Sequence, residues 1–271
     1  MRTSKLAATL SAALAISLFC VPGIAHALDC ASRIDAKSGS VLETIVELYT
    51  SEGCDSCPPA DKWFSSLNYP RDGVVPLTFH VDYWDYIGWK DRFAKPAYAQ
   101  RQRDAVSRQR SRASYTPQVM LDGRDLRDWS HPSRFQSRVR EVSSRAPRAN
   151  LTLEAILKGN SVEAALSATV AQPLDRMEAE LFIAITENNL SSRVTSGENK
   201  GVVLKHDHVV RELIGPLPFE SKDRALGNFQ VKRLFTLVPE WKRSDLALVS
   251  FLQNSHTGEV LQALSTPLCR R

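Results

Sequence analysis

Two cysteines with two residues between them, in the segment 54–57 (Cys-Asp-Ser-Cys), are the clearest chemical signal in the sequence. They follow the apolar stretch 41–49 and precede two prolines that begin at Pro58, where a missing N–H suits the first turn of a helix. The free amides of a helix N-terminus favour an anion and lower the pKa of a thiol. Cys54 would attack a disulfide and Cys57 would resolve the mixed disulfide, so the spacing predicts thiol–disulfide exchange.

Two other interpretations of this cysteine pair are open. As soft thiolates, Cys54 and Cys57 would bind copper(I), which predicts a periplasmic copper-handling protein. As a static disulfide, they would brace a non-catalytic binding module. Zinc is less favoured because the chain has no second cysteine pair at this spacing. For thiol–disulfide exchange we expect no bound metal and no cofactor.

The chain begins with the pattern of a secretory signal peptide, residues 1–27. Arg2 and Lys5 precede the apolar run 6–19, and the small residues that end at Ala27 match a cleavage site. The run is shorter than the ~20 residues that cross a bilayer. We therefore expect a secreted or periplasmic protein, cleaved near Ala27, without stable membrane insertion.

Export to an oxidising compartment favours disulfide pairing of the remaining cysteines. Cys20 leaves with the signal peptide, and four of the five cysteines remain. Cys54 and Cys57 suit each other, which leaves Cys30 to pair with Cys269. A bridge between the two chain ends would stabilise the fold by at least ~4 kcal/mol in the chain-entropy model. The alternative is two unpaired terminal thiols, a liability in an oxidising compartment.

The composition is that of a globular protein. The chain has 271 residues, of which 43% are apolar and 24% charged, so it is neither collagen-like nor disordered. Its formal charge of +5 falls when Arg2 and Lys5 leave with the signal peptide. The remaining charge is too weak to predict a nucleic-acid partner.

Residues 41–146, after an N-terminal segment 28–40, alternate between strand-like and helix-like patterns. The order is β-α-β-α-β-β-α, and a helical crossover makes the first two strands parallel. The predicted strands are 41–49, 74–81, 117–121 and 124–128. The first predicted helix begins at Pro58, and the other two span 96–113 and 131–146. This pattern predicts an α/β domain.

A period of two replaces this alternation after the linker 147–150. Seven short strands in residues 150–271 predict an antiparallel β-sandwich domain. Their centres are 151–157, 162–166, 180–185, 202–210, 229–235, 246–252 and 259–264.

The segment Tyr115-Thr116-Pro117 stands before the third predicted strand. The residues and the element order together resemble the thioredoxin superfamily, in which a cis-proline faces the cysteine pair. The residue before that proline pairs its backbone with the substrate. The resemblance therefore implies a thioredoxin-like domain, assigns Thr116 and Pro117 to the catalytic site, and places Tyr115 beside the substrate.

A closer resemblance covers nearly the whole chain beyond residue 27. It rests on the motifs ELYTSEGCDSCPPAD at 47–61, FHVDYWDYIGWKD at 79–91, YTPQ at 115–118 and DGR at 122–124. These are similar to domain-of-unknown-function family 1223, a family of secreted thioredoxin-like proteins. The resemblance implies a fold and a site but no substrate.

One departure from the thioredoxin pattern bears on the direction of exchange. Typical thioredoxins carry Gly-Pro between the cysteines and strong oxidants often carry His, whereas this chain carries Asp55 and Ser56. A carboxylate beside Cys54 disfavours the thiolate, so the disulfide form is held more tightly. We expect a reductant or an isomerase-like enzyme that acts on the thiols or disulfides of exported proteins, with electrons from an unidentified donor.

Glu47 and the aromatic segment 83–95 are further candidates. Glu47, seven residues before Cys54, is either the general base for Cys57 or an ordinary strand acid. Trp84 and Trp89 are predicted to bind substrate at the rim of the site, and the alternative is a packed insertion.

Several histidines and arginines are not favoured as functional residues. His80 and Asp82 share a strand face near the site rim, but a metal-ligand role for His80 is not favoured. His206 and His208 are predicted to lie on the surface of one strand. A solvated helix face is expected for the arginines at 101, 103, 108, 110 and 112.

Overall fold

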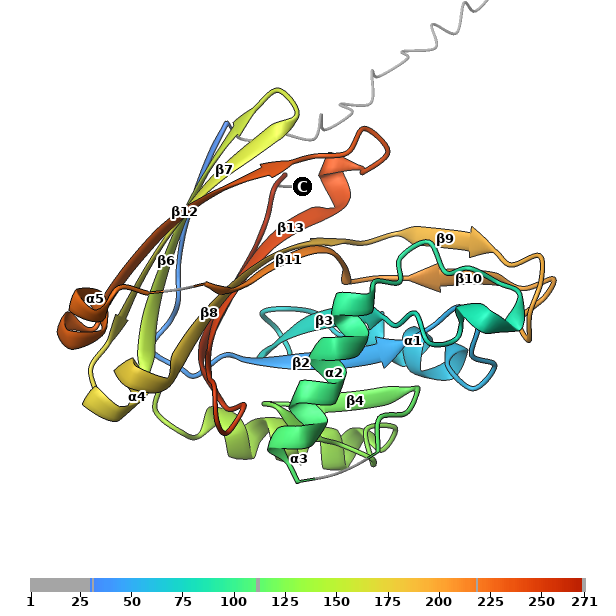
Figure 1. Cartoon of the computed structure of the whole chain (residues 1–271), viewed down its shortest axis with the longest axis horizontal. Helices are drawn as coiled ribbons and strands as arrows, with labels where there is room; N and C mark the ends of the chain where they lie inside the picture. Colours follow the sequence, from blue (N-terminus) through green and yellow to red (C-terminus); the bar gives the residue numbers. More distant parts are fainter. Residues whose placement is uncertain (1–29, 31, 111–112, 218, 270–271) are drawn as a thin grey trace, which may run out of the picture.

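The computed structural model describes residues 30, 32–110, 113–217 and 219–269 and shows a mixed α/β protein, mostly strands with few helices (Figure 1). The expected signal peptide, 1–27, lies outside these residues. The strands are β1 (Arg33–Lys37), β2 (Thr44–Thr50), β3 (Val74–His80), β4 (Gln118–Leu121), β5 (Arg124–Asp125), β6 (Ala149–Lys158), β7 (Ser161–Val170), β8 (Ala179–Glu187), β9 (Leu190–Arg193), β10 (Val203–His206), β11 (Val209–Leu217), β12 (Asn228–Thr236), β13 (Leu246–Asn254) and β14 (Val260–Pro267). The helices are α1 (Pro58–Phe64), α2 (Pro96–Arg108), α3 (Pro132–Ser143), α4 (Pro173–Glu178) and α5 (Ser221–Leu226), with short 3-10 turns η1 (Asp85–Ile87) and η2 (Arg243–Asp245).

The elements of the first region follow the predicted order. After β2 come α1, β3, α2, β4, β5 and α3. Strands β2 and β3 are parallel, and β4 runs antiparallel to β2. Pro58 and Pro59 open α1, as their missing N–H groups favour.

The main sheet extends across the boundary expected near 147–150. Its order is β14-β13-β8-β11-β3-β2-β4-β5, so strands from both predicted regions share one sheet. The join is a parallel pairing of β11 with β3 at Val209 and Thr78. Strand periodicity does not reveal this join because it depends on pairing between residues far apart in the chain.

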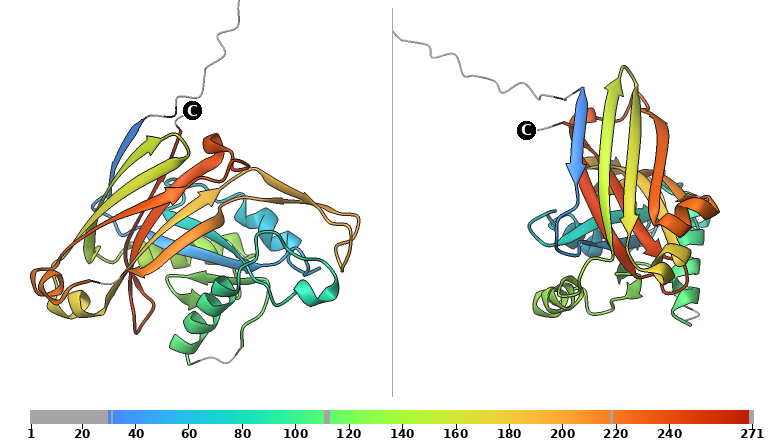
Figure 2. Two further views of the ribbon diagram at one scale, coloured as in Figure 1. Left: turned by 45° about the horizontal axis from the view of Figure 1, so that its top comes forward. Right: turned by 90° about the vertical axis from the view of Figure 1, so that its left-hand side faces the viewer.

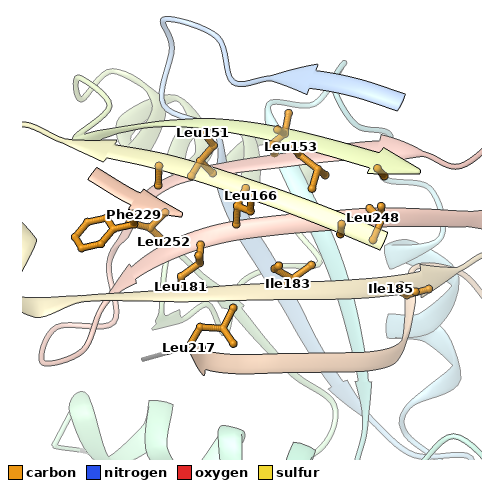
Figure 3. Close-up of a cluster of buried hydrophobic side chains, with 14 of the residues drawn as sticks. Leu151, Leu153, Leu166, Leu181, Ile183, Ile185, Leu217, Phe229, Leu248 and Leu252 are labelled. Atoms are coloured by element: carbon orange, nitrogen blue, oxygen red, sulfur yellow. The ribbon is translucent and has the colours of Figure 1, made fainter. Parts of the chain in front are cut away.

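A second sheet, in the order β1-β6-β7-β12, packs against β8, β13 and β14. Buried leucine, isoleucine and phenylalanine side chains fill the space between the two sheets (Figure 3). Strand β1 lies in the segment 28–40, where the sequence pattern predicts no strand, and it pairs with β6.

Different helices cover the two faces of the main sheet. On β2, Ile45 and Tyr49 face the cluster that includes α2, whereas Val46 and Leu48 face α1 and α3. This alternation follows from the period of two in a strand. It decides which side chains of β2 can reach the cysteines.

The predicted strand 202–210 is wrong in one respect. It forms two strands, β10 and β11, which are separated at His208, a residue with a φ of +57°. Strand β9, which pairs with β10, was not predicted. The resulting two-stranded β9–β10 ribbon extends beyond the end of β11 and lies over α1 (Figure 1).

The two ends of the described chain are joined. Cys30 and Cys269 form a disulfide, as predicted, across a sequence separation of 239 residues. The start of β1 and the C-terminus lie at the same end of the molecule in both views of Figure 2.

Candidate functional site

The cysteine pair lies where the end of β2 meets the start of α1. Cys54 and Cys57 form a disulfide, and Cys57 is the N-cap residue of α1. Both cysteines are 0% exposed, whereas Asp55 and Ser56 between them are exposed. The site is therefore present but covered.

The Thr116–Pro117 segment lies beside this turn. Its peptide bond is cis, as the resemblance implied. The register pairs Tyr49 of β2 with Gln118 of β4, so Pro117 comes opposite the end of β2 just before the cysteines. Tyr115 is half-buried, and its hydroxyl donates to Asp125 at 2.8 Å.

The aromatic segment 83–95 contacts both the cysteine turn and the Thr116–Pro117 segment. The indole N–H of Trp84 donates to the Thr116 hydroxyl at 2.7 Å, and that of Trp89 donates to Glu52 at 2.8 Å. Gly53 leaves little room for a side chain, because an added Cβ would lie 3.2 Å from Trp84. Both tryptophans are thus half-buried in the wall of the site, and Tyr86, 81% exposed, forms its outer surface.

A loop from the second region covers the disulfide. In residues 194–202, between β9 and β10, the side-chain amide of Asn199 donates to the carbonyls of Glu52 and Cys54, both at 2.9 Å. Glu198 accepts from the backbone N–H of Asp55 at 3.2 Å. No local signal in the sequence links this loop to residues about 145 positions away, so its place at the site is not predictable from the sequence.

Glu47 is not brought to the cysteines. Its carboxylate accepts from Arg101 of α2 at 2.7 Å, on the face of β2 opposite α1. Thr50, three residues further along, points to the other face and donates to Asp61 of α1 at 3.1 Å. The alternation of a strand therefore directs Glu47 away from Cys57.

His206 is buried, contrary to the expectation of a surface position, and His80 is buried as well. His206 lies between Glu52 at 3.3 Å and Asp61 at 3.8 Å, and His80 contacts Asp91 at 2.6 Å. Burial alone lowers the pKa of His206, but the two carboxylates outweigh it and raise the pKa to about 10. The chain turns after β10 at His208, whose φ is +57°, and the two rings make different contacts, His206 with Glu52 and Asp61 and His208 with Leu67.

His208 itself reaches the backbone of a different element. Its ring contacts the carbonyl of Leu67 at 3.2 Å, and burial lowers its pKa. The arginines of α2 do not form the fully solvated helix face that was expected. Arg103 is exposed, but Arg101 and Arg108 turn inward.

A family model described as "Protein of unknown function (DUF1223)" matches residues 45–253. The chain belongs to this family. The matched range contains the cysteine pair, the aromatic segment, the Thr116–Pro117 segment and the covering loop. Comparison with curated protein sequences finds no match.

Two solved structures resemble this DUF1223 protein in fold. Protein AGR_C_4864 from Agrobacterium tumefaciens is 21% identical, with a TM-score of 0.57, and the match covers 84% of this chain and 95% of that one. HBP35 of Porphyromonas gingivalis is 16% identical, with a TM-score of 0.63, over 84% of this chain and 76% of that one. At these identities the likeness concerns the fold alone.

No group of three or more His, Cys, Asp or Glu side chains among the described residues of the DUF1223 chain has the arrangement of a metal site. None of the helices in the same residues has the length and apolar character needed to cross a membrane.

Loosening the covering loop is expected to speed reduction of the Cys54–Cys57 disulfide. Asn199→Ala removes two hydrogen bonds worth about 1 kcal/mol each, and 1.4 kcal/mol corresponds to a factor of ten. We expect reduction by dithiothreitol to become about tenfold faster or more, measured by quenching with an alkylating agent and mass spectrometry. Asn150→Ala, at an exposed position of β6, is the matched control. An unchanged rate in Asn199→Ala would show that the loop does not limit access.

Proposed function

We propose that this DUF1223 protein is an exported thiol–disulfide oxidoreductase that acts as a reductant or isomerase on exported proteins. The observation that carries the proposal is the disulfide between Cys54 and Cys57 at the junction of β2 and α1, beside the cis Thr116–Pro117 bond. In our interpretation, residues 41–146 are a thioredoxin-like domain and 150–271 a β-sandwich joined to it through a shared sheet.

The two cysteines and the segment Tyr115-Thr116-Pro117 have distinct roles in this mechanism. The thiolate of Cys54 attacks a substrate disulfide, forms a mixed disulfide and releases one substrate thiolate. Cys57 then loses its proton, attacks Cys54 and releases the second substrate thiolate. The substrate gains two electrons, which the cysteine pair loses, and a partner protein must return them. Thr116 and Pro117 align the substrate, with Tyr115 at its edge.

The charges near Cys54 support the reducing direction. The carboxylate of Asp55 follows Cys54 directly, and that of Glu198 lies at the Asp55 amide. Negative charges disfavour a thiolate, and a less stable thiolate makes the reduced form a stronger reductant.

Export is supported by the signal-peptide pattern of residues 1–27 and by the two disulfides. Disulfides persist in oxidising compartments and are rare in the cytoplasm of most organisms. The substrates we propose are therefore exported protein thiols or disulfides.

A graded thiol–disulfide buffer series tests the proposal. After equilibration and alkylation, mass spectrometry should show Cys54 and Cys57 titrating together while Cys30 and Cys269 stay bridged. The midpoint is expected well below the potential of strong oxidants, about −120 mV. A midpoint at that value would contradict the reducing direction.

The burial of both cysteines favours a second candidate, a static disulfide in a binding module. In that case the exposed Tyr86 and the β9–β10 ribbon would contact a partner. The same titration separates the two functions, because a static disulfide would resist reduction as strongly as Cys30–Cys269.

A further inference from the structure

The cover over the cysteine pair comes partly from residues 190–206, which form β9, β10 and the loop between them. We call this segment the lid (Figure 1). Its residue Asn199 binds the backbone carbonyl of Cys54, and both Cys54 and Cys57 are 0% exposed. Thiol–disulfide exchange begins when a thiolate reaches a disulfide sulfur. The cover must therefore open before any substrate or reductant can react.

The lid leaves the main sheet through two residues with a left-handed backbone conformation. Asn189, between β8 and β9, has a φ of +56°, and His208, between β10 and β11, has a φ of +57°. The backbone N–H of Asn189 donates to the carboxylate of Asp207 at 2.8 Å, so the two connections lie side by side. Hinges are usually a few residues at the ends of elements. The lid thus has the geometry of a two-stranded unit attached at one narrow base.

His206 is the buried contact between the lid and the two sides of the cysteine turn. Its ring lies 3.3 Å from Glu52, before Cys54, and 3.8 Å from Asp61 of α1. We call these three side chains the latch, and none of them is more than 6% exposed. The facing atoms have no hydrogen bond among the described residues. Attraction between charges, which is stronger away from water, is therefore what joins them.

We propose that the lid is a pH-sensitive cover of the Cys54–Cys57 disulfide, held closed by the latch and released as the pH rises. Because it regulates the exchange reaction, this inference rests on the proposed function. A protonated His206 attracts both carboxylates and holds the lid on the site. A neutral ring gives no such attraction and leaves two buried carboxylates without this counter-charge. Exchange is therefore slow in neutral surroundings and faster in alkaline ones.

The direction of the response follows from the protonation of His206. Burial lowers its pKa, but the carboxylates of Asp61 and Glu52 outweigh burial and raise the pKa to about 10. With the lid open the ring is in water, where the pKa of a histidine is about 6.5. Below about pH 6.5 the ring is protonated in both states, so the latch has its full strength. Above that pH only the closed lid keeps the proton, and opening becomes about tenfold more favourable per pH unit.

The carboxylate side of the latch responds in the acid range. Burial raises the pKa of Glu52, but the contacts with His206, Ser192 and Trp89 outweigh burial and lower it. The contribution of Glu52 is thus complete above its ordinary pKa of 4.5 and is lost as the pH falls further. The lid is held most firmly between these two ranges.

The other charged groups around His206 come from β3, the aromatic segment, β11 and the chain neighbours of His206. They are His80, Asp91, Arg92, Arg211, Lys205 and Asp207. Asp91 pairs with His80 at 2.6 Å, and the two arginines lie over the Phe93 ring that packs on His206. The contacts to Glu52 and Asp61 are therefore the ones that hold the proton on His206.

Reduction of the oxidised protein by tris(carboxyethyl)phosphine tests the proposal. The rate of reduction of Cys54–Cys57 is measured across the neutral and alkaline range by mass spectrometry after alkylation. Each wild-type rate is divided by the rate of His206→Gln at the same pH, which cancels the pH dependence of the reagent. At neutral pH we expect His206→Gln to be reduced about tenfold faster or more. The ratio of wild type to variant should rise at least about tenfold over two pH units.

Glu52→Gln is a second test of the latch. The variant keeps an acceptor for the indole N–H of Trp89 but removes one of the two charges that face His206. We expect faster reduction at neutral pH and a smaller rise with pH than in the wild type. This variant also tests the latch if His206→Gln does not fold.

The matched control is His208→Asn, which removes a second buried histidine at the base of the lid. Its ring contacts the carbonyl of Leu67 and not a carboxylate, and burial lowers its pKa, so it is neutral throughout the tested range. Asparagine tolerates the positive φ at this position. This control should keep the wild-type profile. Asn199→Ala, which loosens the lid but keeps the latch, should be faster at every pH with an unchanged rise.

The outcomes separate this inference from the proposed function. A ratio of wild type to His206→Gln that stays level across the pH range, or a wild-type profile in Glu52→Gln, overturns the latch alone. The proposed function fails in a different experiment, the graded thiol–disulfide buffer series. If Cys54 and Cys57 do not exchange there even in His206→Gln, both the exchange reaction and its regulation are overturned.

Discussion

Replacing Cys57 by serine is expected to leave Cys54 covalently joined to its substrate. Cys54 can still attack a disulfide, but no second thiol remains to resolve the mixed disulfide, so the complex accumulates. The change converts a transient intermediate into a stable product. The measurement is non-reducing electrophoresis of the exported fraction, followed by mass spectrometry of the peptide that contains Cys54.

The matched control is Cys54→Ser, which keeps one cysteine at the site but removes the nucleophile. It should capture nothing, and Cys30–Cys269 should remain intact in both variants. Because Cys54 is fully buried, adding Asn199→Ala to Cys57→Ser should speed the capture. Equal capture by Cys54→Ser and Cys57→Ser would contradict the roles assigned to the two cysteines.

Replacing Arg101 by methionine is expected to lower the free energy of unfolding by about 3–5 kcal/mol. The guanidinium pairs with the buried carboxylate of Glu47 and lies within 5.6 Å of the ring centres of Phe79, Phe182 and Phe251. Its loss leaves Glu47 buried without a counter-charge. It also removes a contact between α2, β3 and the strands β8 and β13, which come from different regions of the chain.

Urea unfolding measures this effect. Arg103→Met, on the exposed face of the same helix, should change stability by less than about 0.5 kcal/mol. Adding Glu47→Gln to Arg101→Met should restore part of the loss, since the unpaired charge is then removed. A loss below about 1 kcal/mol in Arg101→Met would show that the buried pair contributes little.

The sequence was most informative where a signal is local. Proline at the first turn of α1, the spacing of Cys54 and Cys57, and the alternation of apolar residues in β2 all act within a few positions of each other. These features predicted the element order 41–146 and the place of the cysteine pair between a strand and a helix. The bridge between Cys30 and Cys269 followed from the cysteine count and the signal-peptide pattern.

The sequence was least informative where an outcome depends on which face of a strand is covered. Glu47 and Thr50 belong to the same strand, yet only Thr50 turns toward α1. Sequence periodicity gives the alternation but not which set faces the cysteines. His206 was expected on the surface because strand β9 and the turn at His208 carry weak signals.

By itself the sequence determined the position of the cysteine pair between a strand and a helix, because a paired cysteine motif and the residues that begin a helix are encoded within a short segment. Only the tertiary structure decided what surrounds that chemistry. Glu198 and Asn199 reach the cysteine turn, and His206 reaches Glu52 and Asp61, because β11 joins β3 and carries the β9–β10 ribbon over α1. Pairing between strands so distant in the chain depends on the whole sheet and leaves no local pattern to read.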